Sequence, residues 1–105
     1  MLLTALAVVA AAPAYAYITV QGQIGTVQTV GSAGGGPGNF DFRVYLTSVA
    51  VICNGQNLAY INTMDSNHSA TVATLLTAKT VGSNVGISIV QDAQGYCQIA
   101  WLSVD

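Results

Sequence analysis

Apolar and polar residues alternate along the segment YITVQGQIGTVQTV, residues 17–30, which is the pattern of a half-buried β-strand. Ile18, Val20 and Ile24 share one phase of this alternation. Val27 falls out of that phase, and the glycines before it predict a bulge that bends the strand. We therefore expect one long first strand that changes direction partway along its length.

A second alternating stretch is FDFRVYL, residues 40–46. Its apolar face, which we expect in the core, contains Phe40, Phe42, Val44 and Leu46. Its other face contains Asp41, Arg43 and Tyr45. Residues 49–53 continue as strand-like sequence, and Asn54-Gly55 predicts a two-residue hairpin turn because both residues tolerate positive φ. Residues 56–63 would then form the returning strand.

A helical period replaces the alternation after residue 65. Apolar side chains recur at i, i+3, i+4 and i+7, so one helix face would contain Val72, Leu75, Leu76 and the stem of Lys79. Asp65 or Ser66 is suited to cap the start of this helix, and Gly82 is suited to its end. Residues 84–90 and 96–104 predict two further strands. One face of the last strand would contain Cys97, Ile99, Trp101 and Ser103.

The predicted order is therefore β-β-β-α-β-β, which describes an all-β chain with one helix. Five short strands with a helix between the third and fourth are typical of the OB-fold, a small Greek-key barrel. The first strand of such a barrel must bend to serve both sheets, and the glycine-rich change of phase would supply that bend. The alternative architecture is a two-layer α+β sandwich.

The first sixteen residues, MLLTALAVVAAAPAYA, resemble a removable secretory signal. They carry no charge, are mostly apolar, and end in an A-x-A pattern that predicts cleavage after Ala16. The alternative is an apolar helix that stays on the protein. Residues 17–105 form a single predicted domain with no further apolar run of about 18 residues, so we expect no membrane insertion. A secreted or periplasmic location follows from the signal.

The chain has two cysteines, Cys53 and Cys97. An even number of cysteines in an exported chain predicts one disulfide, with two buried thiols as the alternative. The Cα atoms of a bridged pair should lie within about 7 Å of each other.

Only 6% of the residues are charged, and the formal net charge is −2 with two Lys and Arg residues in all. That balance argues against a nucleic-acid partner, which needs a row of cations along the phosphates. The single histidine, His68, falls among polar residues at the predicted helix start, where a solvated role is expected. One histidine and scattered aspartates make neither a catalytic triad nor a metal site. We therefore expect a binding protein that is not an enzyme and has no cofactor.

The aromatic residues are the remaining binding chemistry, because amphipathic rings stack on ligands and anchor interfaces. The candidate ligand-binding residues are Asp41, Arg43, Tyr45, Tyr60 and Trp101. Two of these have plainer interpretations: Arg43 as a partner of Asp41, and Trp101 as a core residue beside Ile99. A surface with so few charges also predicts a homo-oligomer, because part of it must be covered.

The stretches FDFRVYLTSVAVICNGQNLAYINTMDSN, LLTAKTVG, ISI and CQIAWLSV resemble small secreted bacterial proteins similar to the B subunits of subtilase-type and pertussis-like toxins. The resemblance implies an OB-fold, a ring of five subunits and binding of cell-surface glycans, often sialylated. It also makes a toxin A subunit a candidate partner. The alternative function is a structural or protein-interaction component, such as an assembly subunit or an inhibitor, with no glycan activity.

Overall fold

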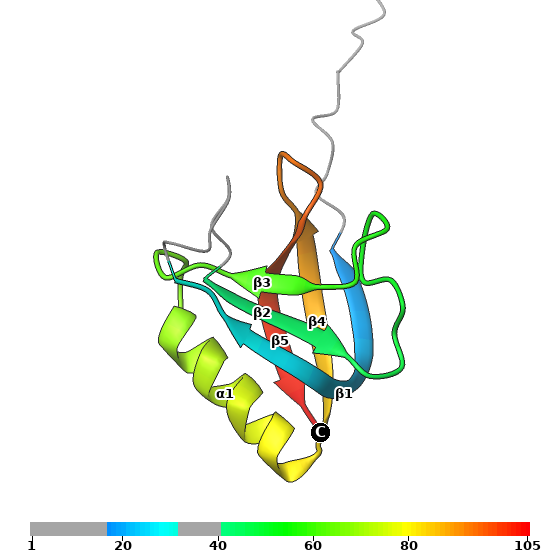
Figure 1. Cartoon of the computed structure of the whole chain (residues 1–105), viewed down its shortest axis with the longest axis vertical. Helices are drawn as coiled ribbons and strands as arrows, with labels where there is room; N and C mark the ends of the chain where they lie inside the picture. Colours follow the sequence, from blue (N-terminus) through cyan, green and yellow to red (C-terminus); the bar gives the residue numbers. More distant parts are fainter. Residues whose placement is uncertain (1–16, 32–40) are drawn as a thin grey trace, which may run out of the picture.

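A computed structural model describes residues 17–31 and 41–105 of the chain. The described part is mostly β-structure with one helix, as predicted (Figure 1). Its elements, in chain order, are β1 (Ile18–Thr29), β2 (Phe42–Leu46), β3 (Ala59–Ile61), α1 (His68–Val81), β4 (Asn84–Gln91) and β5 (Cys97–Val104). The predicted signal sequence and Phe40 lie outside the described residues. No helix within the described residues is long and apolar enough to cross a membrane.

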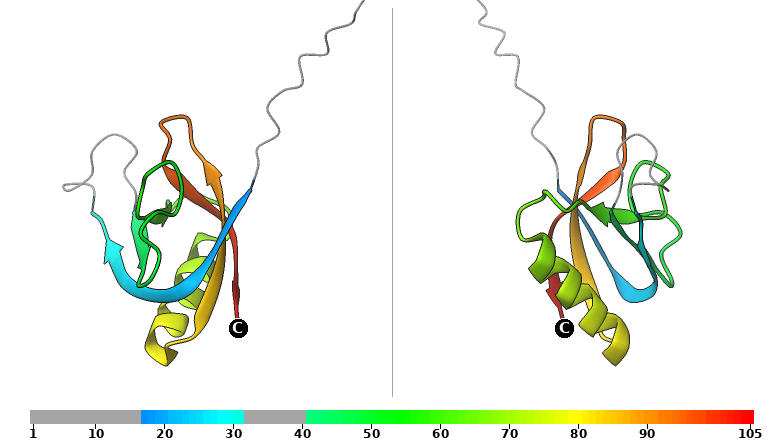
Figure 2. Two further views of the ribbon diagram at one scale, coloured as in Figure 1. Left: turned by 90° about the vertical axis from the view of Figure 1, so that its right-hand side faces the viewer. Right: turned by 60° about the vertical axis from the view of Figure 1, so that its left-hand side comes forward.

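The strands form a closed barrel in the order β1-β2-β3-β5-β4. Neighbouring strands are antiparallel except β3 and β5, which are parallel and meet at one residue pair, Tyr60 with Gln98. β5 pairs with β4 from Cys97 to Val104, with one register shift that leaves out Ala100. Helix α1 packs against β1 and β5 and lies along the outside of the barrel (Figure 2).

The predicted bend in β1 is present, and it lets one strand serve two neighbours. The first half of β1 pairs with β4 and the second half with β2. The register with β2 shifts between Ile24 and Thr26, which leaves Gly25 as the extra residue of a bulge. A Cβ atom at Gly25 would lie 3.1 Å from Thr47 Oγ1, so a glycine suits this close approach. Figure 2 shows the curve of β1 around one end of the barrel.

The barrel interior is filled by apolar side chains from all five of these strands and from α1. The inward face of β2 is as predicted: Phe42, Val44 and Leu46 are buried, while Arg43 and Tyr45 are half-buried on the outside. Fully burying a side chain of this size stabilises the folded state by roughly 1.5–3 kcal/mol. The alternation of this short segment therefore sets which face of the sheet meets the core.

The predicted helix face is confirmed in part, because Leu75 is buried and Val72 packs partly buried against the core. Leu75 and Ala78 are the buried residues of α1, whereas Leu76 is 43% exposed. Lys79 is also exposed, and its ammonium group donates a hydrogen bond to the Gly25 carbonyl oxygen at 2.8 Å. The helix therefore contacts β1 and β5 through Val72, Leu75 and Ala78, while Leu76 and Lys79 lie at the margin of this contact.

The predicted end of the helix is confirmed, and its predicted start is wrong. Gly82 has φ 76° and its N–H donates to carbonyl oxygens of the last turn. At the start, Asn67 occupies the cap position with φ 58° and makes no side-chain cap bond. Asp65 does not cap because its carboxylate accepts the Asn62 N–H at 2.8 Å and the Gln98 side-chain amide at 2.9 Å. Both bonds end on Oδ2, and they hold the Asp65 side chain toward Asn62 and β5.

The Asn54-Gly55 turn is confirmed, but its flanking strands are shorter than predicted. Both residues have positive φ, 44° and 73°. Residues 49–53 form no ladder, and Cys53 makes only an isolated bridge to Gln56. The two arms leave the sheet because the turn reaches toward the β4–β5 turn, where the Asn54 side chain donates to the Gly95 carbonyl oxygen at 3.2 Å.

The predicted disulfide between Cys53 and Cys97 is confirmed, with a Cα–Cα distance of 5.9 Å. Both residues are buried. The bridge joins the Asn54-Gly55 turn to the first residue of β5. That residue is next to Gln98, at which β5 meets β3. The covalent link therefore lies beside the weakest seam of the barrel.

We expect the double variant Cys53→Ala/Cys97→Ala to lose about 4 kcal/mol of unfolding free energy, because the bridge closes a loop with a sequence separation of 44. That is a large part of the roughly 5–15 kcal/mol that stabilises a typical domain. Urea unfolding of the oxidised protein and the variant measures the difference. A loss of no more than about 0.5 kcal/mol, the size of an ordinary surface effect, would contradict this expectation.

Candidate functional site

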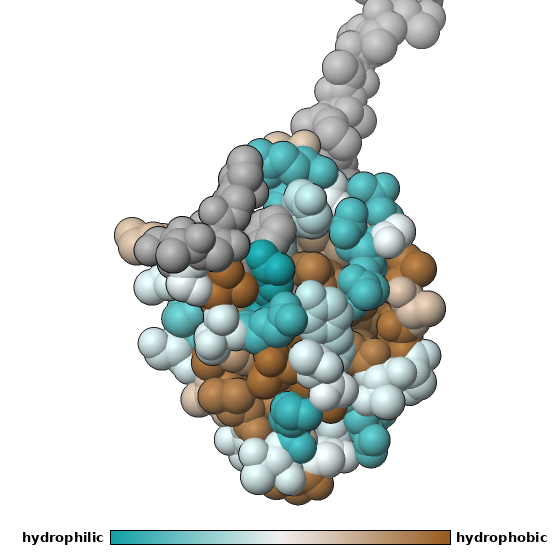
Figure 3. All heavy atoms as spheres, in the orientation of Figure 1, coloured by the Kyte–Doolittle hydropathy of each residue, from teal (hydrophilic) through white to brown (hydrophobic). Residues whose placement is uncertain are grey.

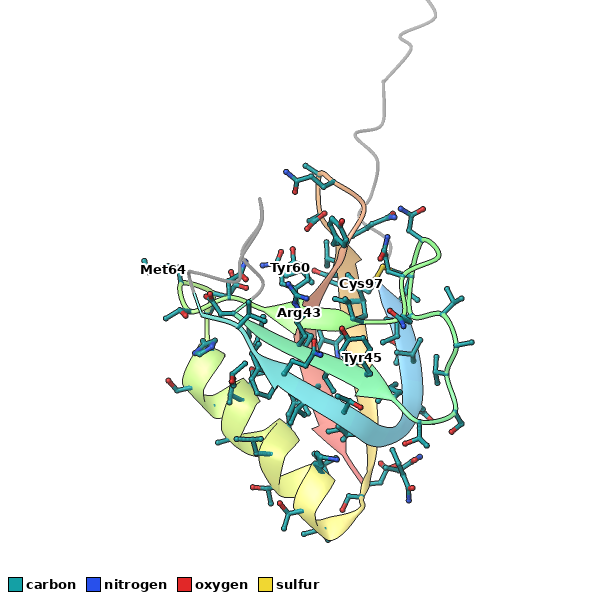
Figure 4. The ribbon with its side chains drawn as sticks, viewed as in Figure 1. Arg43, Tyr45, Tyr60, Met64 and Cys97 are labelled. Atoms are coloured by element: carbon teal, nitrogen blue, oxygen red, sulfur yellow. A yellow bond between two sulfur atoms is a disulfide. The ribbon has the colours of Figure 1, made fainter. Side chains whose placement is uncertain are left out.

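Four of the five candidate ligand-binding residues lie on or beside β2 and β3. Arg43 on β2 pairs across the sheet with Tyr60 on β3, and Tyr60 pairs with Gln98 on β5. Arg43, Tyr45 and Tyr60 all lie on this side of the barrel in Figure 4. Together they form a polar row across the outer surface of three strands, which we call the β2–β3 row: Asp41, Arg43, Tyr45, Tyr60 and Gln98.

Tyr60 is the most buried member of the β2–β3 row, at 3% exposure. Its hydroxyl group donates a hydrogen bond of 2.5 Å to Asp92 Oδ2, from the β4–β5 turn. Burial raises the pKa of Tyr60 well above its usual value, and the Asp92 carboxylate adds to that effect. Tyr60 therefore stays a neutral donor that connects β3 to the β4–β5 turn, and its ring is not open to a ligand.

The other polar groups of the row are also engaged within the barrel. Asp41 accepts hydrogen bonds from the Thr63 backbone N–H and hydroxyl group, and these hold the pKa of Asp41 below its usual value. The Tyr45 hydroxyl group donates to Gln28 Oε1 at 3.0 Å, which connects β2 to β1. These hydrogen bonds of the β2–β3 row thus connect neighbouring segments of the barrel, and they occupy the polar groups of Asp41 and Tyr45.

Trp101 lies elsewhere, and the prediction that favoured a core position for it is wrong. The ring is 51% exposed. The register between β4 and β5 shifts so that Ser88 pairs with Trp101 and Ile89 with Ile99, which leaves Ala100 without a partner on β4. This extra residue reverses the phase of the strand, so Leu102 packs against the core and Trp101 turns outward.

An open pocket of about 330 Å³ lies beside Trp101, between the start of α1 and the outer part of β5. The ring forms part of one wall, and it is contacted by Tyr17 at a centroid distance of 4.6 Å. Small hydroxyl, amide and methyl groups form the rest. We call this the Trp101 pocket, and its lining residues are Ser66, Asn67, Ala70, Thr71, Thr74, Ala100, Trp101 and Leu102.

A second open groove, of about 340 Å³, continues along α1 toward the end of β5. Thr74 lines both hollows, and Val81 and Val104 lie at the far end of the second. These two valines are 72% and 41% exposed. Figure 3 shows apolar residues over α1, with polar residues gathered around the β4–β5 turn. The second groove therefore has exposed apolar side chains at its far end.

The polar lining of the Trp101 pocket was not anticipated from the sequence. Asn67, Thr71 and Thr74 recur at i, i+4 and i+7, which puts three small polar residues on one face of the helix. That spacing was an available signal. The apolar residues between these three positions indicate the buried face of the helix, and the polar spacing is less evident beside them.

The described residues contain no cluster of three or more His, Cys, Asp or Glu side chains that could hold a metal ion. His68 is half-buried at the start of α1. No protein-family model, no curated protein and no solved structure matches the chain. The Trp101 pocket, with its exposed ring and polar rim, is the candidate site that the geometry favours.

Replacing Tyr60 with Phe should lower the unfolding free energy by about 1.5–3 kcal/mol, the range for a hydrogen bond to a charged group. Tyr45→Phe is a matched control, since it removes an exposed hydroxyl bond and should cost less. The raised pKa of Tyr60 gives a second readout. An unfolded tyrosine ionises near pH 10, so this contribution is complete below about pH 10 and is lost as the pH rises further. Denaturant unfolding between neutral and alkaline pH tests both points, and an unchanged alkaline loss in Tyr60→Phe would contradict them.

Proposed function

We propose that this protein is a secreted, non-catalytic OB-fold module that binds glycans. The OB-fold proposal is supported by the closed barrel, by the bent β1 shared between two neighbours, and by the position of α1 between β3 and β4. Export is supported by the A-x-A pattern at the end of the apolar leader and by the disulfide, which persists in oxidising compartments.

The observation that carries the glycan proposal is the exposed ring of Trp101 at the wall of a polar pocket. A sugar presents a face of C–H groups that packs on an aromatic ring and a rim of hydroxyl groups that need hydrogen bonds. Trp101 supplies the ring, while Asn67 and Thr71 supply polar groups at its side. The volume of about 330 Å³ lies at the lower end of the range for small-ligand sites.

A ring of identical copies is the second part of the proposal, and the resemblance to toxin B subunits suggests five. It is supported by the low charge of the surface and by the exposed apolar side chains along the α1–β5 groove. The same groove favours the alternative function, an interaction component with a protein partner. A toxin A subunit would be one such partner.

Trp101→Ala should weaken glycan binding by about thirtyfold or more, because an aromatic ring that the ligand covers on binding is worth about 2 kcal/mol or more. A glycan array on residues 17–105 identifies the ligand, and calorimetry then measures its affinity. Trp101→Phe should retain part of the binding. His68→Ala, at the helix start but outside the pocket lining, should stay within about threefold, as expected for a residue of little energetic weight. Equal binding by Trp101→Ala and the unaltered protein would exclude this site.

Light scattering on the oxidised protein at micromolar concentration should give a mass several times that of one subunit. A stable contact between copies should bury about 800 Å² on each partner. Thr77→Lys, in the second groove, should shift the protein toward single subunits. Thr80→Lys is its matched control, because Thr77 and Thr80 both bond the carbonyl oxygen four residues earlier at 2.9 Å but only Thr77 lines the groove. A mass of one subunit for the unaltered protein would contradict the ring.

A further inference from the structure

The Trp101 pocket is lined without any charged side chain. The chain has one Arg and one Lys, and both lie outside the lining of this pocket. Arg43 lies on β2 in the β2–β3 row. Lys79 donates its ammonium hydrogen bond to the Gly25 carbonyl oxygen at 2.8 Å. An acidic sugar placed on Trp101 would therefore have no Lys or Arg side chain to pair with.

The formal charge next to this pocket in the chain is negative. Asp65 directly precedes Ser66 of the pocket lining, and its Oδ2 atom is held by the Asn62 N–H and the Gln98 amide. A carboxylated ligand beside Ser66 would be repelled by this carboxylate. It would also lose water without gaining an ion pair, which is costly for any charge.

The start of α1 also borders the pocket, and helix N-termini carry a partial positive charge that attracts anions. Two features reduce that attraction here. The Asp65 carboxylate comes three residues before the first helical residue, His68, and its negative charge offsets part of the positive charge of the helix N-terminus. The His68 N–H, one of the groups at the helix end, already donates to the Asp65 carbonyl oxygen at 3.3 Å. The N-terminus of α1 therefore offers a ligand partial charges and no full cation.

The polar groups of the pocket instead match hydroxyl groups. Ser66 and Thr71 can each donate and accept a hydrogen bond, as a sugar hydroxyl group can. The Asn67 amide has two donors and one acceptor, and it makes no cap bond with the helix. We infer that the ligand of the Trp101 pocket is a neutral sugar, in contrast to the sialylated glycans that the resemblance implies. This inference rests on the proposed glycan-binding function.

Trp101 is the only tryptophan of the chain, so its fluorescence reports directly on the pocket. The probes are the methyl glycosides of glucose, galactose and mannose, each beside the corresponding uronic acid, which differs by one carboxylate. The best neutral glycoside should bind at least about tenfold more tightly than its uronic acid, since the carboxylate has no partner. Its affinity should change by less than about twofold between roughly 0.05 M and 0.5 M salt, because no charge pair is screened.

Ala70→Lys adds a cation at an exposed position of the pocket lining, and it should reduce the preference for neutral sugars. Thr80→Lys adds the same charge to the same helix outside this lining and should leave the preference unchanged. Tighter binding of the uronic acids by the unaltered protein, weakened by salt, would overturn the inference and leave the proposed function standing. Acetylation of the Tyr17 α-amino group is a further control. If it abolished a preference for uronic acids, the inference would also be overturned, and this amino group would be the cation that pairs with the carboxylate. No change in fluorescence with any sugar, together with an empty glycan array, would overturn both.

Discussion

The covalent bond between Cys53 and Cys97 holds the start of β5 in place, and the rest of the structure depends on that position. β5 completes the barrel by meeting β3, yet the two strands share only the pair of Tyr60 with Gln98. The disulfide lies one residue before Gln98 and brings the Asn54-Gly55 turn against the same point. A seam with so little strand pairing needs such a link, because loop closure in the unfolded chain would otherwise oppose it.

Side-chain hydrogen bonds reinforce the same seam. The Tyr60 hydroxyl group connects β3 to the β4–β5 turn through Asp92, and Gln98 connects β5 to the segment before α1 through Asp65. These contacts explain why the aromatic and charged residues of the β2–β3 row serve the barrel. They also explain why the pocket forms where it does. Once β5 and the start of α1 are fixed relative to each other, the space between them is bordered by their outward side chains.

Much of this fold could be predicted from local pattern. The alternation in β2 and the turn at Asn54-Gly55 depend on nearest neighbours, and both are present. The helix cap could not be predicted in the same way, because Asp65 is taken by Gln98, which is 33 residues away. The candidate site was only partly predictable for a related reason. A glycine within a strand, such as Gly25 in β1, indicates a bulge, whereas an alanine such as Ala100 does not. The alternation of β5 therefore predicts that Trp101 faces the core with Ile99.

The unpartnered Ala100 has a consequence for how such a barrel could change over evolutionary time. Deleting the single codon for this residue would remove only the extra residue, so the tryptophan would follow Ile99 directly, still pair with Ser88 and still face outward. The barrel seam at Gln98 precedes this point and would be untouched. The outward position of the ring is thus fixed by its pairing with Ser88, and the extra residue can be lost without turning the aromatic wall into the core.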